Sequence, residues 1–248
     1  MAARRPKPAP ASARARKGVA VRTWPRRILG WVIRGVILFL LGSVLLVLFY
    51  RFVPPPVTIT MLGDLAQGHS INKDWISLSR MDRNMARAAI AAEDGNFCTH
   101  HGFDFSAMQK AFQGNVQGRR LRGGSTISQQ TAKNVFLWQG RSYVRKGLEA
   151  WFTLLIETMW GKRRIMEVYL NVAETGIGTY GANAGAIRYF HHDASRLSPA
   201  EAGRIAAVLP LPSKREAIAP TGATRRYGNR ITQRIGMIRR GGYDRCLR

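Results

Sequence analysis

Two adjacent acidic residues, Glu93 and Asp94, stand at the end of an apolar stretch and are followed at once by aromatic and imidazole side chains. A carboxylate beside apolar surface has a raised pKa and becomes a candidate proton acceptor. A helix that ends in two solvated acids explains the same pattern equally well, so the residues alone leave both interpretations open. The apolar residues before the acids recur at the spacing of one helix face: Met81, Met85, Ala88, Ala89 and Ala92.

A second segment combines glycines, hydroxyl side chains and cations. The glycine pair at 123–124 lets the backbone approach a ligand closely, and Ser125 and Thr126 can cap the helix that follows. A helix N-terminus attended by Lys133 suits an anionic group. The segment lacks the GxxxxGK[ST] pattern of a P-loop. An ordinary glycine turn into a capped helix explains the glycines and hydroxyls but not the polar run 129–133.

A third group, Arg145, Lys146 and Glu149, stands at the start of an amphipathic helix pattern. At about 100° per residue, Arg145 and Glu149 lie at the edge of the apolar stripe. Charges at a core edge are costly unless they are paired or functional. An i,i+4 ion pair worth about 0.2–0.5 kcal/mol is compatible with a functional role, and we keep both interpretations. The stripe comprises Leu148, Trp151, Phe152, Leu155 and Met159.

Two other patterns are set aside because their partners are missing. Ser70 and Lys73 match the SxxK motif of penicillin-binding transpeptidases, but no SxN or KTG motif follows. The histidine pairs at 100–101 and 191–192 do not predict a metal site, because adjacent residues share neither a helix face nor a strand face. No HExxH motif is present.

Charge and cysteine content narrow the choice of partners. The 248 residues include 39 Lys+Arg and 14 Asp+Glu, a net charge of +25, which predicts phosphate-bearing partners: nucleic acid, anionic lipid or a phosphorylated substrate. The two cysteines, Cys98 and Cys246, have no metal-site spacing. A single long-range bridge fits an oxidising compartment, but the sequence favours two unpaired thiols.

The N-terminal region predicts a membrane anchor. Residues 1–27 contain nine basic and no acidic residues and are expected to be a disordered cytoplasmic tail. Residues 28–50 form an apolar run with one charge, Arg34, which is long enough to cross a bilayer. The positive-inside rule places the N-terminus in the cytoplasm and everything after Pro54 outside it, and residues 51–74 are expected to be a linker. Because exported proteins rarely meet DNA, this topology argues against a nucleic-acid partner.

The remainder of the chain is predicted to be mainly helical, with glycine-rich loops at 114–124 and 176–185. Ser198 and Glu201 form a capping box that opens a helix, and Pro210 stops it. The sequence leaves open whether the basic C-terminal segment 221–248 closes the domain or lies on the membrane.

These segments, in this order, resemble the family-51 glycosyltransferases, and within them the monofunctional peptidoglycan-polymerising enzymes of Gram-negative bacteria. The resemblance covers about residues 75–220, and Thr131 stands where an aliphatic residue is usual. The pattern EDxxFxxHxGFD is met by residues 93–104, GGSTITQQ by 123–130 with Ser128 for Thr, RKxxE by 145–149, KxxILExYLN by 162–171 with Met166 for Leu, and the alanine-rich last motif by 206–212.

The resemblance implies a mainly α, lysozyme-like domain with a smaller membrane-associated lobe, preceded by one transmembrane helix. The implied substrate is an undecaprenyl-pyrophosphate disaccharide-peptide, lipid II, and the implied product is a β-1,4 glycan strand for the cell wall. An α-linked donor that gives a β product requires inversion, and therefore one in-line displacement with a base on the acceptor hydroxyl. The leaving pyrophosphate needs charge stabilisation more than a proton.

The matched motif positions imply a role for each candidate residue. Glu93 would be the catalytic base, and Glu149 would orient the cationic cluster or help to ligate a divalent cation. No cofactor is expected as a firm requirement, with Mg²⁺ or Mn²⁺ at the pyrophosphate as the open alternative. The substrate-binding residues would be Lys133 and Arg141 at the donor pyrophosphate, Arg145 and Lys146 nearby, and Asp94, Ser125, Thr126 and Gln129 in support.

The expected partners are lipid II and its growing glycan chain, the bacterial inner membrane and other cell-wall synthases, and the domain is expected in the periplasm. Two other function classes stay open. A lytic transglycosylase would also use one Glu in a helical domain, and polymerisation and cleavage assays would separate the two. A non-enzymatic basic membrane or nucleic-acid binder would explain the charge but not two acids within apolar patterns.

Overall fold

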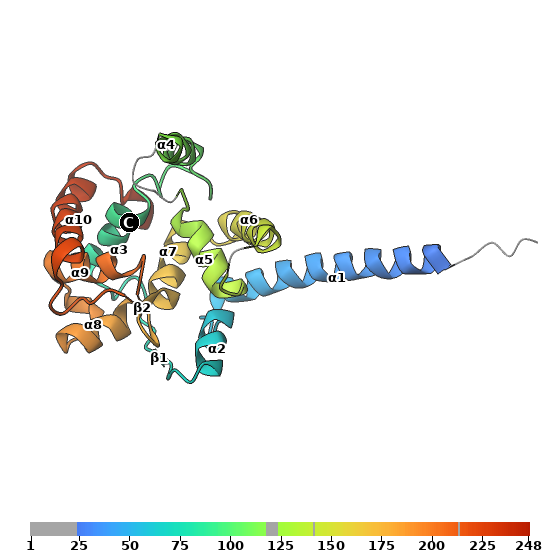
Figure 1. Ribbon diagram of the computed structural model, residues 1–248, viewed down its shortest axis with the longest axis horizontal. Coiled ribbons are helices and arrows are strands. Elements are labelled where there is room, and N and C mark those ends of the chain that lie inside the picture. Colours follow the sequence, from blue (N-terminus) through green and yellow to red (C-terminus); the bar gives the residue numbers. More distant parts are fainter. Residues whose placement is uncertain (1–23, 118–123, 141, 213) are drawn as a thin grey trace, which may run out of the picture. The chain divides into compact units, whose positions relative to one another are not determined.

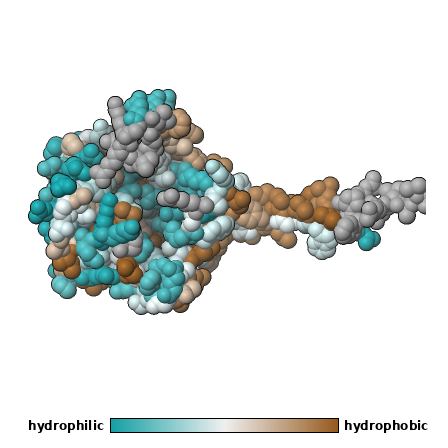
Figure 2. Space-filling model, in the orientation of Figure 1, coloured by the Kyte–Doolittle hydropathy of each residue, from teal (hydrophilic) through white to brown (hydrophobic). Residues whose placement is uncertain are grey.

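The computed structural model describes residues 24–248 except 118–123, 141 and 213. It begins with helix α1, Trp24–Phe52 (Figure 1). Of the predicted tail 1–27, residues 1–23 lie outside the described part and residues 24–27 belong to α1. Within the described residues, Arg27–Phe52 is the one helix long and apolar enough to cross a membrane. Apolar side chains cover much of its surface (Figure 2).

The chain divides into two compact units between Leu41 and Gly42. The second unit is mostly helical, as predicted, and it has one small sheet of order β1-β3-β2. Strand β1 pairs with β3 in parallel, and β2 pairs with β3 antiparallel. Its elements are α2 Ile59–Ala66, β1 Asn72–Lys73, α3 Arg83–Glu93, α4 Phe105–Val116, α5 Ile127–Phe136, α6 Tyr143–Met159, α7 Gly161–Val172, β2 Glu174–Gly176, β3 Thr179–Tyr180, α8 Ala182–Phe190, η1 Ala194–Arg196, α9 Pro199–Val208, α10 Gly222–Arg240 and η2 Arg245–Leu247.

Two groups of helices make up most of this unit. Helices α3, α9 and α10 contact one another, and so do α5, α6 and α7. The predicted capping box is present at the start of α9, where Ser198 and Glu201 exchange hydrogen bonds. Side chains from both groups belong to one continuous apolar core. The C-terminal end of α3 faces α5, and this is where the first predicted acid lies.

The glycine-rich stretch 176–185 is more ordered than predicted. It contains strand β3 and the start of α8 rather than a loop. Gly178 and Gly181 have φ values of +67° and +91°, which favour glycine. A Cβ on Gly178 would clash with the Ser70 carbonyl oxygen, and one on Gly181 would meet the Asn171 backbone. These glycines therefore serve close packing and not flexibility. Of the other predicted loop, 114–124, residues 114–116 lie in α4 and 118–123 are outside the described part.

Helix α10 closes the domain, which answers the question that the sequence left open for 221–248. Ile231, Ile235 and Ile238 are buried, and α10 contacts both α3 and α9. The approach to α9 is close, because a Cβ on Gly203 would lie 3.0 Å from the Gly228 carbonyl oxygen. The helical spacing of these three isoleucines therefore marks the face of α10 that packs against α3 and α9.

The prediction of two unpaired thiols was wrong. Cys98 and Cys246 form a disulfide with an S–S distance of 2.03 Å. The chain after α10 turns back and brings Cys246 against the loop that follows α3, with 5.4 Å between the two Cα atoms. That separation lies within the range a disulfide spans. The sequence could not show it, because 148 positions separate the two residues and only the tertiary fold unites them.

The last turns of α1 belong to the second unit and are fixed to α6 and α7. Trp151 donates a hydrogen bond of 3.0 Å to Ser43 Oγ, and Trp160 donates one of 2.7 Å to the Val47 carbonyl oxygen. Arg164 donates to the Tyr50 carbonyl oxygen at the helix end. Residues 43–50 of α1 are therefore a packed part of the second unit.

Candidate active site

Glu93 is the last residue of α3 and contacts the other helix group through α5. Its Oε2 accepts a hydrogen bond of 2.8 Å from Gln130 Nε2. The side chain keeps some access to solvent, as a proton acceptor must, yet burial raises the pKa of the Glu93 carboxyl above its usual value. The Gln130 hydrogen bond and the nearby Arg215 and Lys133 side chains oppose that rise. The acid is therefore desolvated, and the interpretation as a solvated helix end does not hold.

Several residues that surround Glu93 were not picked out from the sequence. Tyr169 of α7 donates a 3.4 Å hydrogen bond to Gln130 Oε1, and Tyr227 of α10 donates one of 3.0 Å to the Ala92 carbonyl oxygen. The Arg215 guanidinium lies over the Tyr227 ring. Gln130 and Tyr169 belonged to matched motifs, which was a usable signal. Arg215 and Tyr227 lie on segments whose nearness to Glu93 only the fold reveals.

Asp94 holds the loop after Glu93 in place and is not free to bind a ligand. Its side chain is buried, and its oxygens interact with His100 Nε2 at 2.9 and 3.0 Å. Asp94 Oδ2 also accepts a 2.9 Å hydrogen bond from the backbone N–H of Ile127, the first residue of α5. One carboxylate thus ties the loop 94–103 to itself and to the N-terminus of α5.

Thr126 and Gln129 are likewise buried and form hydrogen bonds within the protein. They form a capping box at the start of α5, and both side chains are buried. The Thr126 hydroxyl donates a 2.6 Å hydrogen bond to the Gly102 carbonyl oxygen, which again connects α5 with the loop after Glu93. Ser125 is exposed and is the member of this predicted group with a solvent-facing side chain. The structure therefore places Thr126 and Gln129 behind the site.

The cationic side of the site combines Lys133 of α5 with three charged residues of α6. Glu149 is 3% exposed, and its Oε2 accepts a 2.8 Å hydrogen bond from Arg145 Nη1. Its Oε1 pairs with Lys146 Nζ. Arg145 Nε is buried and has no hydrogen-bond partner in the described part of the chain. The predicted i,i+4 pair is thus present and buried, and the cations outnumber the carboxylate that gathers them.

Lys133 lies between the two carboxylates and is paired with neither. Burial lowers the pKa of its ammonium group, with Glu149 as the strongest opposing influence and Glu93 as a weaker one. No hydrogen bond or ion pair holds its Nζ within the described residues. A partly desolvated cation without a partner is suited to an anionic ligand. Arg141, the other predicted pyrophosphate residue, lies outside the described residues.

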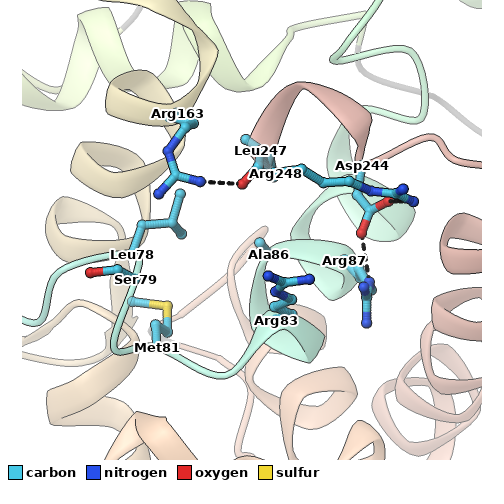
Figure 3. A pocket seen from close by; sticks show the side chains of 10 residues that line it. All are labelled: Leu78, Ser79, Met81, Arg83, Ala86, Arg87, Arg163, Asp244, Leu247 and Arg248. Atoms are coloured by element: carbon cyan, nitrogen blue, oxygen red, sulfur yellow. Dashed lines mark hydrogen bonds and ion pairs between the residues drawn. The ribbon is translucent and has the colours of Figure 1, made fainter.

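A pocket in the described part of the chain lies away from these residues. It has a volume of about 170 Å³ and contains none of the predicted site residues (Figure 3). Arginines from α3 and α7 and the C-terminal turn line it, together with Asp244. The described residues contain no group of three or more His, Cys, Asp or Glu that could hold a metal ion.

Comparison with known proteins decides the family. A family model described as Transglycosylase matches residues 60–236. The chain belongs to this transglycosylase family. A Biosynthetic peptidoglycan transglycosylase of Caulobacter vibrioides is 51% identical over 223 residues, which cover 90% of this chain and 97% of the relative. Relatives of the same name in Xanthomonas campestris pv. campestris (strain B100) and Pseudomonas aeruginosa are 48% and 49% identical, over 87% and 85% of this chain and 87% and 92% of theirs.

Membership confirms the family resemblance and the fold class predicted from the motifs. This transglycosylase has a mainly α, lysozyme-like domain, and the matched region 60–236 includes Glu93, the cationic cluster and most of α10. It is a glycosyltransferase enzyme, and the non-enzymatic alternative is excluded. The roles of individual residues stay predictions, to which the geometry adds that neither Glu93 nor Lys133 forms an ion pair with another described residue.

Proposed function

We propose that this transglycosylase polymerises lipid II into β-1,4 glycan strands for the cell wall, with inversion and with Glu93 as the base. One observation carries the proposal: Glu93 is desolvated, and the nearby cation Lys133 has no hydrogen-bond or ion-pair partner among the described residues. A proton acceptor next to a site for an anionic leaving group is what an inverting transfer from a pyrophosphate requires. The names of the relatives support peptidoglycan as the product.

The reaction follows from these two groups. Glu93 accepts the proton of the acceptor's 4-hydroxyl while that oxygen forms a bond to the anomeric carbon of the donor. The bond from the anomeric carbon to the pyrophosphate oxygen breaks, and its electron pair leaves with the pyrophosphate. Lys133, with Arg145 and Lys146, stabilises the charge on that leaving group. Arg141 would also bind the donor pyrophosphate, which is the role that its motif position implies. Gln130 holds the Glu93 carboxylate in one orientation.

Glu149 acts as the counter-ion that keeps the cations together. Both of its oxygens are engaged by cationic side chains, which leaves it poorly suited to ligate a metal ion in this arrangement. Cationic side chains can supply the charge that the leaving group needs. No step of the proposed reaction therefore passes through a metal ion, and a divalent cation at the pyrophosphate stays a prediction.

The apolar N-terminal helix is consistent with a membrane anchor, and we place the domain in the periplasm on the inner membrane. Nine basic residues in 1–27, before the apolar run 28–50, and few charges directly after that run support an N-in topology. The disulfide supports it independently, because disulfides form in oxidising compartments outside the cytoplasm. A reporter enzyme fused after Arg248 that works only outside the cytoplasm should be active. Activity of a cytosol-only reporter at that position would overturn the topology.

The function is tested by incubating the purified protein with lipid II in detergent or liposomes and measuring glycan length. We expect uncrosslinked polymer that is insensitive to β-lactams, because no transpeptidase motif set accompanies the SxxK pattern. Lys73 of that pattern donates to the Pro55 and Pro56 carbonyl oxygens, which is a structural role. Cleavage of preformed glycan without polymerisation would instead indicate a lytic enzyme. Interaction with other cell-wall synthases is part of the proposal and calls for co-purification.

A further inference from the structure

The C-terminal residues 241–248, here called the C-terminal hook, are fastened at three points to the scaffold of the site. Asp244 accepts a 2.8 Å hydrogen bond from Arg87 Nε of α3, and Arg163 of α7 donates to the Leu247 carbonyl oxygen (Figure 3). The third point is the covalent bond between Cys246 and Cys98. The hook therefore connects the helix that carries Glu93, the helix that carries Tyr169 and the loop after Glu93.

Cys98 lies in the loop that follows Glu93. It follows Glu93 by five residues, between Asp94 and His100, whose side chains interact with each other. The other attachments of this loop are non-covalent and include the Asp94 bond to the Ile127 N–H, the Thr126 bond to the Gly102 carbonyl oxygen and the packing of Phe97 in the core. The disulfide is the single covalent brace on the loop in the described part of the chain.

We propose that the Cys98–Cys246 disulfide positions Glu93 for catalysis, so that turnover by this enzyme depends on the thiol redox state of its compartment. The proposal rests on the base role of Glu93 stated under the proposed function. A brace with a purely stabilising role would change the melting temperature but not the chemistry of the folded enzyme. The two roles therefore differ in what they predict for the reduced, folded protein.

Reduction breaks one S–S bond and leaves two thiols on the protein. A dithiol such as dithiothreitol supplies the two electrons and two protons, and it becomes a cyclic disulfide after a mixed-disulfide intermediate. Re-formation needs a disulfide oxidant, in the cell a thiol–disulfide oxidoreductase. Both cysteines retain some solvent exposure, so that a small reductant can reach them.

Loss of the brace should change both the position and the hydration of Glu93. A shift of about 1 Å in a catalytic group can cost roughly 10²-fold in rate. A looser loop also admits water, and since burial is what raises the Glu93 pKa, that pKa should fall. Of the charged and titratable groups that face Glu93, Lys133, Tyr169, Arg215 and Tyr227 stay in place on other elements, and Asp94 lies in the loop itself.

The test uses the full-length enzyme in detergent and measures kcat, KM for lipid II and the pH profile before and after treatment with dithiothreitol. We expect kcat to fall at least about tenfold with KM changed less than about twofold, and the acid limb of the pH profile to move to lower pH. Removal of the dithiol and addition of oxidised glutathione should restore both. The Cys98→Ser/Cys246→Ser double variant should have the kcat, KM and pH profile of the reduced parent. Dithiothreitol should not change them.

Leu197→Ala is the matched control, because Leu197 is buried in the core and belongs neither to the hook nor to the site residues named above. It should lose thermal stability while its folded fraction keeps the parental kcat and pH profile. An unchanged kcat and acid limb in the reduced enzyme would overturn the proposal, and so would the same losses in Leu197→Ala. A wrong base assignment would show in a separate measurement. Glu93→Gln would then keep the parental activity both with and without dithiothreitol.

Discussion

The two glutamates of this site differ in what surrounds them more than in where they lie. Glu93 ends a helix, receives one amide hydrogen bond and is raised in pKa by burial. Glu149 lies within a helix, and each of its oxygens is bound by a cationic side chain. The first carboxylate has no ion pair among the described residues and can take a proton, and the second is a counter-ion. One residue type thus serves two roles because its environment differs.

The same contrast separates the two halves of the proposed reaction. On the Glu93 side, apolar helix ends and tyrosines from α7 and α10 remove water from a single acid. On the Glu149 side, cations outnumber the acid, and one of them, Lys133, is unpaired in the part of the chain that the structure describes. Proton removal belongs to the first region and charge stabilisation to the second. Variants that alter one region at a time should therefore produce different kinetic defects.

Glu93→Gln should have the largest effect. The amide keeps the shape of the side chain but cannot accept a proton, and general-base assistance is worth roughly 10²–10⁴ in rate. The variant should fold and bind lipid II, yet make almost no polymer. Glu216→Gln, on an exposed glutamate, should behave as the parent. Near-parental polymerisation by Glu93→Gln, together with an inactive Glu149→Gln, would reverse the roles of the two carboxylates.

Glu93→Gln should also change the pH dependence of stability. A group whose pKa is raised by folding contributes stability that is full below its unfolded pKa and is lost as the pH rises through its folded value. The parent should therefore lose stability as the pH rises from about 4 through that window, and the variant should not. Melting curves of both proteins across this range provide the measurement. Parallel curves would show that Glu93 is not desolvated.

Lys133→Ala should have the next largest effect. Loss of a transition-state charge contact commonly costs about 2.7–4 kcal/mol, or roughly 10²–10³ in rate. Stability should be kept or rise slightly, since burial of the ammonium group is unfavourable and no ion pair compensates for it. Lys110→Ala, on the exposed face of α4, is the control. A Lys133→Ala enzyme with full turnover would show that the donor site lies elsewhere.

Glu149→Gln should be partly active and less stable. The amide oxygen can still accept from Arg145 or Lys146 but not from both, and hydrogen bonds to charged groups are worth about 1.5–3 kcal/mol. The melting temperature should drop by several degrees. Because the cations lose their alignment, KM should rise and the defect should ease at high lipid II concentration. A drop in kcat with unchanged KM would indicate instead that Glu149 acts on the reacting atoms.

The sequence predicted the Glu149 region better than the surroundings of Glu93. The helix that leads into Glu93 and the α6 pair of Arg145 and Glu149 follow from local spacing, and both are present in the structure. The residues that surround Glu93 come from α7, α10 and the segment before α10. No local sequence pattern predicts such long-range contacts. For the same reason the disulfide was missed and the role of α10 stayed open. Asp94 and Gln129 were assigned to the substrate because motifs identify residues without showing what their side chains touch.

Gln130→Ala should have the smallest effect and gives the sharpest test of how Glu93 is tuned. The hydrogen bond from Gln130 Nε2 stabilises the Glu93 carboxylate and so lowers its pKa against the effect of burial. Its loss should move the acid limb of the pH profile to higher pH, opposite to the shift expected on reduction of the disulfide. The rate at high pH should fall only about fivefold, in keeping with a hydrogen bond worth about 1 kcal/mol. Gln233→Ala, on the exposed face of α10, should leave the profile unchanged. An acid limb that does not move in Gln130→Ala would mean that the titrating group in the profile is not Glu93, and the contrast between the two glutamates would then have to be drawn from another residue.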